Sequence, residues 1–265
     1  MSQEWKKTKT IYWSDELNDD FDKVGLSRPE LPKNYKYKRQ NPFYIFFTAI
    51  LYYVIAIPIL FLSAFFVGMK TKGRRNYRLV KKEGCFIYSN HVSLWDPIKL
   101  QTFAFPGKRI NIIGYSDALS IPVANHIIKA LGYLPLPLQN DFDNMKRLDD
   151  ALSYYVNKKH QSVIIYPEAH IWPYYTEIRN FKNGSFSYPA KNLKPVLPVV
   201  TLWKKRIFGK KPKQLIKVGT PIYPDPNKSL IENRDYLRNE CYEQMKKLAA
   251  SEAQVSYIKY IYKKH

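Results

Sequence analysis

The pattern of apolar and polar positions divides the chain into three parts. Residues 1–42 are polar and highly charged, residues 43–69 carry no charge, and from residue 75 to 265 short apolar runs alternate with amphipathic stretches. Buried parallel strands are almost continuously apolar, whereas the helices between them have one apolar face. We therefore expect a polar arm over 1–42, a membrane-anchoring segment over 43–69 and an α/β domain over 75–265.

The apolar runs predict the architecture of that domain. Strands are expected at 85–89, 110–115, 133–138, 162–167, 196–203 and within 214–226. Helical patterns cover 121–132, 143–159 and roughly 229–250; in the second, Met145, Leu148 and Leu152 recur at steps of three and four residues. The alternation of strands and helices predicts a central sheet, mostly parallel or mixed, with helices on its faces.

The uncharged segment 43–69 has the properties of a membrane element. As a helix it would be about 40 Å long, against about 30 Å of bilayer hydrocarbon. Pro58 lies within it, and basic residues flank both ends, namely Lys33, Lys36, Lys38 and Arg39 before it and Lys70, Lys72, Arg74 and Arg75 after it. These features allow a bent helical hairpin in one leaflet or a kinked single span. A wholly buried helix of a soluble domain is a third interpretation, although helices apolar on every face are rare there.

Charge and cysteine content narrow the choice of partners. Lys and Arg number 43 against 22 acidic residues, so the formal charge is +21. This excess favours phosphate-bearing partners such as nucleic acid, anionic lipid or an acidic carrier. The chain lacks zinc-finger, KH and RRM patterns, so we expect no nucleic-acid partner.

Cys85 and Cys241 lie far apart without CxxC spacing, which predicts neither disulfide nor metal site and fits a cytoplasm-facing compartment. The charged start of the chain indicates no secretory signal.

Two polar clusters follow expected strands. His91 and Asp96 come after 85–89, and Glu168 and His170 come after 162–167. The carboxyl ends of such strands usually carry the site of an α/β protein. Asp96 could fix the tautomer of His91, so that the other ring nitrogen takes a proton from an alcohol. Asp96 before Pro97 is also a natural helix N-cap followed by proline at the first helical position, a role that is compatible with catalysis. A short motif does not decide between these roles.

Several segments, taken in order, resemble the glycerolipid acyltransferase family. Its first block, NHxxxxD, stands here as Asn90, His91 and Asp96, and its second resembles "IPVANHIIKALGYLPLP". The third block, usually Phe-Pro-Glu-Gly-Thr-Arg, is represented by "YPEAH" at 166–170. A Phe-Lys-x-Gly element follows as Phe181, Lys182 and Gly184, and "PVLPVV" at 195–200 resembles the fourth block. The resemblance covers about residues 70–225.

The resemblance implies an O-acyltransferase of phospholipid biosynthesis. A fatty acyl group would pass from acyl-CoA or acyl carrier protein to the free hydroxyl of a lysophospholipid, first of all 1-acylglycerol-3-phosphate, without cofactor, metal or covalent acyl-enzyme. His91 would be the general base and Asp96 would orient it. Asn90, Glu168 and Gly184 would belong to the substrate site. Residues 75–265 would form the catalytic domain, held at the cell membrane by anionic lipid and facing the cytoplasm.

Departures from the family pattern concern the acceptor. Leu138 stands near the place of an arginine that ends the second block in many members, and Ala169, His170 and Ile171 replace the Gly-Thr-Arg of the third. Two phosphate-binding arginines are thus missing. Arg179 and Lys182 are the expected substitutes, because a phosphate needs cationic donors. The alternatives are a lysolipid or glycolipid with another head group, or a catalytically silent lipid-binding relative.

Overall fold

A seven-stranded sheet forms the centre of the protein. The computed structural model describes residues 3–21, 28–66, 68–107, 109–120, 124–206 and 211–264. Across the sheet the strands are β2 (Lys70–Lys72), β8 (Lys213–Val218), β7 (Val196–Lys204), β3 (Phe86–Ser89), β6 (Ser162–Ile165), β4 (Ile110–Tyr115) and β5 (Tyr133–Leu136). Neighbours pair in parallel except β7 and β8, which are antiparallel. The predicted α/β fold with a mixed, mostly parallel sheet is therefore confirmed.

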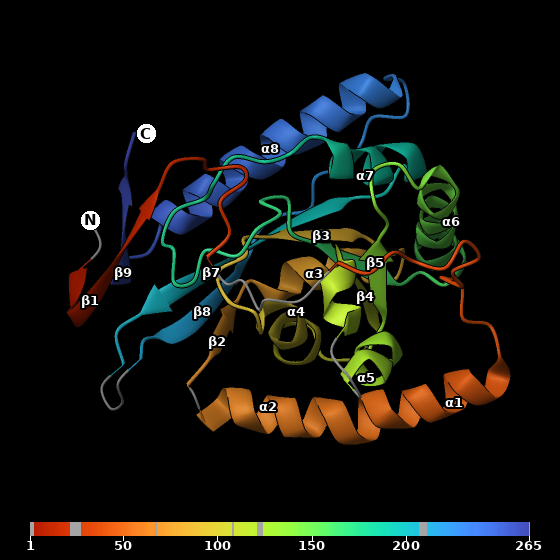
Figure 1. Cartoon of the computed structure of the whole chain (residues 1–265), viewed down its shortest axis with the longest axis horizontal. Coiled ribbons are helices and arrows are strands. Elements are labelled where there is room, and N and C mark those ends of the chain that lie inside the picture. Colours follow the sequence, from red (N-terminus) through yellow and green to blue (C-terminus); the bar gives the residue numbers. More distant parts are fainter. Residues whose placement is uncertain are drawn as a thin grey trace.

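Helices cover both faces of this sheet (Figure 1). On one face pack α6 (Phe142–Ser153), α7 (Ser187–Asn192) and α8 (Leu230–Ala250). On the other pack α3 (Arg74–Val80) and α4 (Asp96–Lys99), which continues as the π-helical η2 (Leu100–Ala104). Cys241 belongs to the first of these two cores and Cys85 to the second, so the sheet separates the cysteines.

Local sequence signals fix where the predicted helices begin. The Asp141 carboxylate accepts a hydrogen bond from the amide of Asn144 at the start of α6, and Ser229 and Glu232 form a capping box at the start of α8. The helix expected at 143–159 continues beyond α6 as η4 (Tyr154–Lys158). Of the helix expected at 121–132, α5 (Ala124–Ala130) is observed, and 121–123 lie outside the described residues.

The uncharged segment forms one uninterrupted helix. α1 (Pro42–Ile50), the π-helical η1 (Leu51–Ala56) and α2 (Ile57–Phe66) follow one another without a turn and lie along the underside of the domain (Figure 1). The wide η1 turn directly precedes the segment that contains Pro58, where a regular helix would lose a backbone hydrogen bond. The hairpin interpretation is wrong, because no reversal of direction occurs within these 25 residues.

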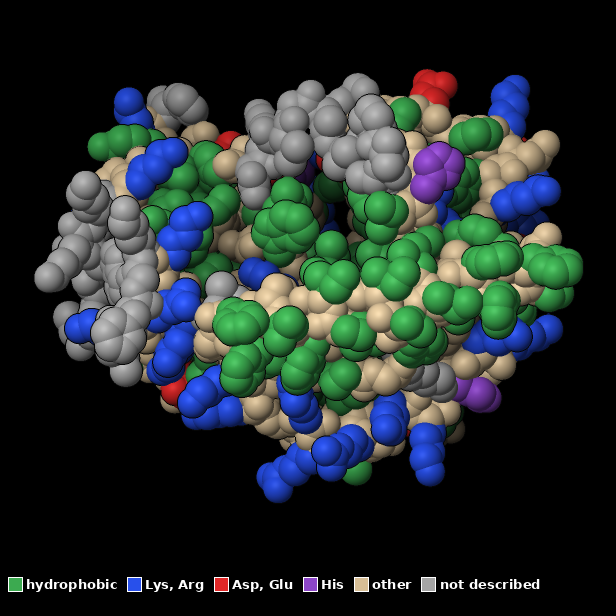
Figure 2. Space-filling view, turned by 90° about the horizontal axis from the view of Figure 1, so that it is seen from below, with side chains coloured by type: hydrophobic (Ala, Val, Ile, Leu, Met, Phe, Trp, Pro, Cys, Tyr) green, Lys and Arg blue, Asp and Glu red, His purple; other side chains and the backbone are tan. Residues whose placement is uncertain are grey.

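Only a narrow face of this helix contacts the domain. Tyr52 and Ala64 are buried, and Arg109 donates a hydrogen bond to the Thr48 hydroxyl at 3.0 Å. Only 11% of the most apolar 18-residue stretch of this helix is buried inside the protein. The interpretation as a buried helix of a soluble domain is therefore also wrong. Figure 2 shows the opposite face as a band of apolar side chains with Lys and Arg side chains beside it. By length and composition the helix could cross a membrane.

The polar arm is integrated into the structure rather than detached from it. β1 (Gln3–Trp13) pairs in parallel with β9 (Val255–Tyr262), a contact between the two ends of the chain that the apolar pattern did not predict. Beyond β1, the Trp172 indole donates to the Asp19 carbonyl at 2.8 Å, and the Phe21 amide donates to the Ile171 carbonyl at 3.2 Å. The arm therefore packs on the loop that follows β6.

Candidate active site

The site is built where β3, β6 and β7 end side by side. Asn90 follows β3 and bridges to β7 through its side chain, which donates to the Thr201 carbonyl at 3.1 Å and accepts from the Thr201 amide at 2.8 Å. The buried side-chain amide of Asn90 thus makes the same pair of hydrogen bonds that a backbone peptide group makes between two strands. This contact holds the next residue, His91, at the edge of the sheet.

His91 is held by its ring and by its backbone. Its imidazole stacks on Tyr166 with ring centroids 4.0 Å apart and an interplanar angle of 21°. Its amide donates to Glu168 Oε2 at 3.1 Å, and its carbonyl accepts from the Trp172 amide at 3.1 Å. The side chain is 13% exposed, so the ring is fixed yet reachable from outside.

Asp96 faces this histidine from the start of α4. Its Oδ2 lies 3.7 Å from His91 Nδ1 and accepts hydrogen bonds from the amides of Val92 at 2.9 Å and Ser93 at 2.7 Å. Gln214, from β8, donates to Oδ1 at 3.3 Å. The N-cap prediction is wrong, because Trp95 occupies the cap position and the carboxylate points back into the loop between His91 and the helix. Its structural contacts and its approach to His91 therefore coexist.

Glu168 and Arg179 form a buried pair behind the histidine. Arg179 Nη2 lies 3.0 Å from Glu168 Oε2, and neither side chain is exposed. Glu168 Oε1 also accepts from the Arg179 amide at 3.0 Å, while the guanidinium donates to the His170 carbonyl and lies over the Trp172 ring. The pair braces the loop that carries the His91 contacts. Arg179 as an acceptor ligand stays a prediction, and in this structure its charge faces Glu168.

The other predicted substrate residues lie further out. Lys182 is exposed, and its Nζ lies 3.4 Å from the Asn18 carboxamide oxygen of the arm. Gly184 begins the short 3-10 helix η5 (Gly184–Phe186) and is exposed, with open space where a side chain would stand. His170 is a loop residue, and its Nδ1 lies 3.3 Å from the Asp20 carboxylate. Substrate contacts of Lys182 and Gly184 stay predictions.

Sequence reasoning missed Tyr166 and Gln214 as site residues. In the sequence, Tyr166 could be recognised only as the first residue of an altered third block. Burial raises the pKa of its phenol well above the ordinary value, and the nearby Asp96 charge raises it further. Gln214 carries no motif, because its place depends on the antiparallel register of β7 and β8. Beside them, burial lowers the pKa of the Lys99 ammonium, which the Asp96 charge partly opposes.

The general-base role of His91 stays a prediction, and the geometry of the site is compatible with it. One imidazole nitrogen faces a buried carboxylate, which leaves the other able to accept a proton. The hydroxyls of Ser89 and Ser93 are engaged with the backbone of Asn90 and Trp95. Among the residues that the structure describes, no group of three or more His, Cys, Asp or Glu side chains could hold a metal ion.

The α/β domain places a histidine and a carboxylate at the carboxyl edge of its sheet, where such domains usually carry their site. The sequence model of the family described as Acyltransferase matches residues 70–202. The chain belongs to this acyltransferase family, as the four ordered blocks indicated.

A solved structure shows the same fold. It is the crystal structure of the 1-acyl-sn-glycerophosphate (LPA) acyltransferase PlsC from Thermotoga maritima, with a TM-score of 0.50 and 20% sequence identity. The match covers 80% of this chain and 96% of that one. At this identity the likeness establishes the fold. No curated protein sequence matches the chain significantly.

Proposed function

We propose that the protein transfers a fatty acyl group from an acyl thioester, acyl-CoA or acyl carrier protein, to the free hydroxyl of a lysophospholipid. The first acceptor to consider is 1-acylglycerol-3-phosphate, which would give phosphatidate. Membership of the acyltransferase family supports the reaction type. The acceptor, the donor and the roles of His91 and Asp96 are the parts of this proposal that require experiment.

In the proposed mechanism His91 is the general base. With Nδ1 directed at Asp96, Nε2 takes the proton of the acceptor hydroxyl as its oxygen attacks the thioester carbonyl. The tetrahedral intermediate then collapses, the carbon–sulfur bond breaks, and the departing sulfur receives that proton from the imidazolium. The products are an ester and a free thiol, and Asp96 stabilises the positive imidazolium between the two steps.

The observation that carries this proposal is the approach of His91 Nδ1 to Asp96 Oδ2, at 3.7 Å. Hydrogen bonds of catalytic groups are often long without substrate and shorten in the complex. The carboxylate is held by two backbone amides and by Gln214, so its position does not depend on the histidine. The partly exposed ring can meet a substrate without movement of the backbone.

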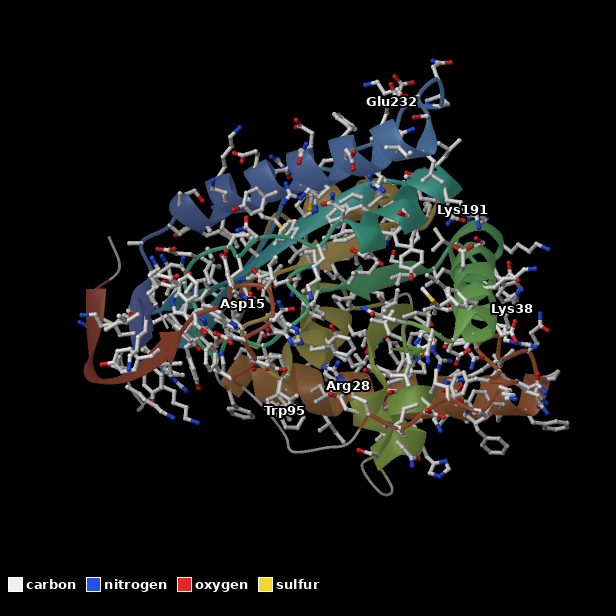
Figure 3. All side chains as sticks on the ribbon, turned by 45° about the horizontal axis from the view of Figure 1, so that its top comes forward. Asp15, Arg28, Lys38, Trp95, Lys191 and Glu232 are labelled. Carbon is white, nitrogen blue, oxygen red and sulfur yellow. The ribbon has the colours of Figure 1, made fainter. Side chains whose placement is uncertain are left out.

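The long apolar helix supports catalysis at a membrane surface. Phe46, Phe65 and Val54 are each more than half exposed on it, and Leu94 and Trp95 are exposed between His91 and α4. α2 packs against α4, so Trp95 lies on the same side of the molecule as this helix (Figure 3). We propose that the helix lies in the interface, with the catalytic domain on the cytoplasmic side, so that an acceptor lipid reaches His91 without leaving the bilayer.

A second acceptor class is favoured by the loop after β6. The Arg179 charge is buried against Glu168, and Lys182 contacts the arm. The arm also places Asp20 against His170. The next residue, Ile171, stands where the family pattern has an arginine. A lysolipid with a larger or less anionic head group would fit these surroundings better than a lysolipid that carries a phosphomonoester. The first experiment therefore includes both kinds of acceptor.

Acyl transfer by the purified full chain in detergent or vesicles tests the proposal. Acyl-CoA and acyl carrier protein serve as donors for a panel of lysolipids, and His91→Ala is compared with the native chain. His126→Ala, which removes an exposed histidine of α5, is the matched control. Loss of about 10²-fold or more in His91→Ala alone supports the general base. Equal activity of both variants contradicts it, and a folded native chain without transfer to any acceptor indicates the catalytically silent relative.

A further inference from the structure

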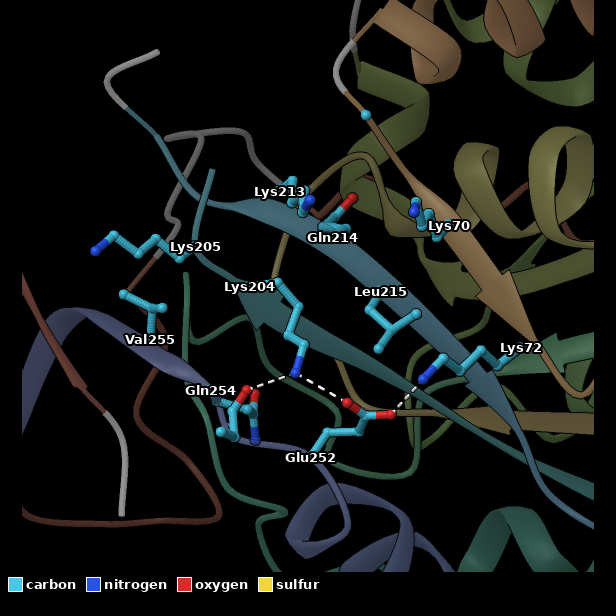
Figure 4. Close-up of a pocket in the computed structure, with 12 residues that line it drawn as sticks. Lys70, Lys72, Lys204, Lys205, Lys213, Gln214, Leu215, Glu252, Gln254 and Val255 are labelled. Atoms are coloured by element: carbon cyan, nitrogen blue, oxygen red, sulfur yellow. Dashed lines mark hydrogen bonds and ion pairs between the residues drawn. The ribbon is translucent and has the colours of Figure 1, made fainter. Parts of the chain in front are cut away.

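A lysine-lined cavity opens beside the catalytic edge of the sheet. It has a volume of about 440 Å³ and lies among β2, β7, β8 and the segment before β9 (Figure 4). Five ammonium groups line it together with two buried amides, contributed by Lys70, Lys72, Lys204, Lys205, Lys213, Gln214 and Gln254. No step of the proposed mechanism uses these lysines.

A single carboxylate offsets part of this charge. Glu252 lies 2.7 Å from Lys72 Nζ and 2.9 Å from Lys204 Nζ, and Figure 4 shows both lysines converging on it. Lys70, Lys205 and Lys213 make no ion pair with any acidic side chain in the part of the chain that the structure describes. The cavity therefore keeps a clear excess of positive charge.

The cavity and the site have one residue in common. β7 runs parallel to β3, so its end at Lys204 lies at the same edge of the sheet as His91. Lys213 pairs with Lys204 across the antiparallel ladder, and the next residue, Gln214, both lines the cavity and donates to Asp96 at 3.3 Å. Gln214 thus belongs both to the lining of the cavity and to the contacts of the carboxylate that faces His91.

The cavity also adjoins the membrane-facing helix. Gly68, two residues after the end of α2, lines it, and the stem of Lys213 packs close to that glycine. Arg206 donates to the Phe66 carbonyl at 3.0 Å, at the carboxyl end of α2. A substrate whose acyl chain follows the apolar helix can therefore place a polar group here.

We propose that this cavity is the phosphate subsite of the enzyme and binds a phosphate-bearing group of one of its two substrates. The source is either the phosphates of a CoA thioester or the phosphate of the acceptor head group. Ammonium groups on flexible stems bind phosphates as point charges, each with three donors. Arg179 and Lys182, the cations expected from the sequence, contact Glu168 and Asn18. Lys70, Lys205 and Lys213 have no acidic partner among the residues that the structure describes. The inference rests on the proposed function.

Binding and kinetics of a double variant test the subsite. Lys70→Ala with Lys213→Ala removes two cavity lysines from the full chain, and Lys146→Ala with Lys247→Ala removes two exposed lysines of α6 and α8 as the charge-matched control. Affinity for CoA and for lysophosphatidate is measured by calorimetry in uncharged detergent. We expect a loss of about 10-fold or more for one of these ligands in the cavity variant only. Arginine at both positions should restore binding, which shows that the charge matters.

The kinetic measurement identifies the source of the phosphate. A raised KM for acyl-CoA, with an unchanged KM for the acceptor, assigns the subsite to the donor. A raised KM for lysophosphatidate but not for monoacylglycerol assigns it to the acceptor. If the affinity and the KM for both substrates equal those of the control variant, the proposal is overturned. This holds even if the cavity variant binds anionic vesicles more weakly than the control, because the lysines would then serve the membrane surface alone. If the native chain transfers no acyl group, the proposed function fails, and the calorimetric comparison still decides whether the cavity binds phosphate.

Discussion

The carboxylate of Glu168 and the guanidinium of Arg179 meet at 3.0 Å with neither side chain exposed to solvent, and the same carboxylate accepts the amide of His91. The glutamate of the third block is therefore tied to the histidine of the first through the backbone. In this structure the pair shapes the loop around the candidate base.

Breaking this pair from one side should be costly. Glu168→Gln leaves the Arg179 charge buried without a counter-ion, which we expect to lower the free energy of unfolding by about 3–5 kcal/mol. Glu168→Gln combined with Arg179→Met should be less destabilised than Glu168→Gln alone, because no charge stays buried. Urea unfolding of the native chain and the two variants in detergent measures this order. Equal stability of Glu168→Gln and the native chain would contradict the bracing role.

Two substitutions of Asp96 separate its structural contacts from its charge. Asp96→Asn keeps an oxygen that can accept from Val92 and Ser93 but removes the charge that faces His91. We expect a near-native melting temperature and a fall in kcat of about 10²-fold or more. Asp96→Ala should lose both stability and rate. If Asp96→Asn transfers acyl groups as fast as the native chain, the carboxylate is only a structural residue.

The hydroxyl of Tyr166 is buried and has no hydrogen-bond partner among the described residues. Its removal in Tyr166→Phe should leave stability unchanged or raise it by about 1 kcal/mol, since an unsatisfied polar group is lost while the stack on His91 remains. Tyr166→Ala should cost about 3–5 kcal/mol through the cavity it creates. Chemical unfolding gives both values. A destabilised Tyr166→Phe would show that the hydroxyl has a partner.

The apolar face of the α1–α2 helix should control binding to membranes. Phe46 and Phe65 lie in its two halves and are 61% and 66% exposed. Each change to Ser should weaken partition onto vesicles about 10-fold or more, from about 1.5–3 kcal/mol of lost burial. Ile231→Ser, at a position 60% exposed on α8, is the control and should have little effect. Sedimentation with vesicles measures this. An effect at one Phe only would argue against a helix lying flat in the interface.

Glu252 gives a prediction about pH. Hydrogen bonds from Lys72 and then Lys204 lower the pKa of its carboxyl from 4.5 to about 2. Because the folded-state pKa is the lower one, the stabilisation is fully present above 4.5 and is lost as the pH falls towards 2. The melting temperature of the native chain should therefore exceed that of Glu252→Gln at about pH 6 and converge with it in acid. A difference independent of pH would show that the ionised carboxylate adds no stability.

Much of the fold could be predicted from local patterns. The strands at 110–115 and 162–167 were found because their buried residues form apolar runs, and the third helix because its amphipathic pattern starts at Ser229. The three-residue β2 and the pairing of β1 with β9 were missed. A very short strand leaves no periodicity, and a charged edge strand looks like a solvated arm until its partner is known.

The candidate site, like the fold, could be predicted from the sequence only in part. By itself, the sequence determined that His91 and Asp96 stand five residues apart after a buried strand, that Glu168 follows another, and that an uncharged helix precedes them, because each is a matter of neighbouring residues. Only the tertiary structure decided that Asp96 turns towards the loop before it, that Arg179 is buried against Glu168, and that the apolar helix runs straight along the domain. Gln214 reaches Asp96 across 118 residues and Trp172 reaches Asp19 across 153. Such contacts depend on which strands pair and on how the loops at their ends pack, and no local pattern encodes that outcome.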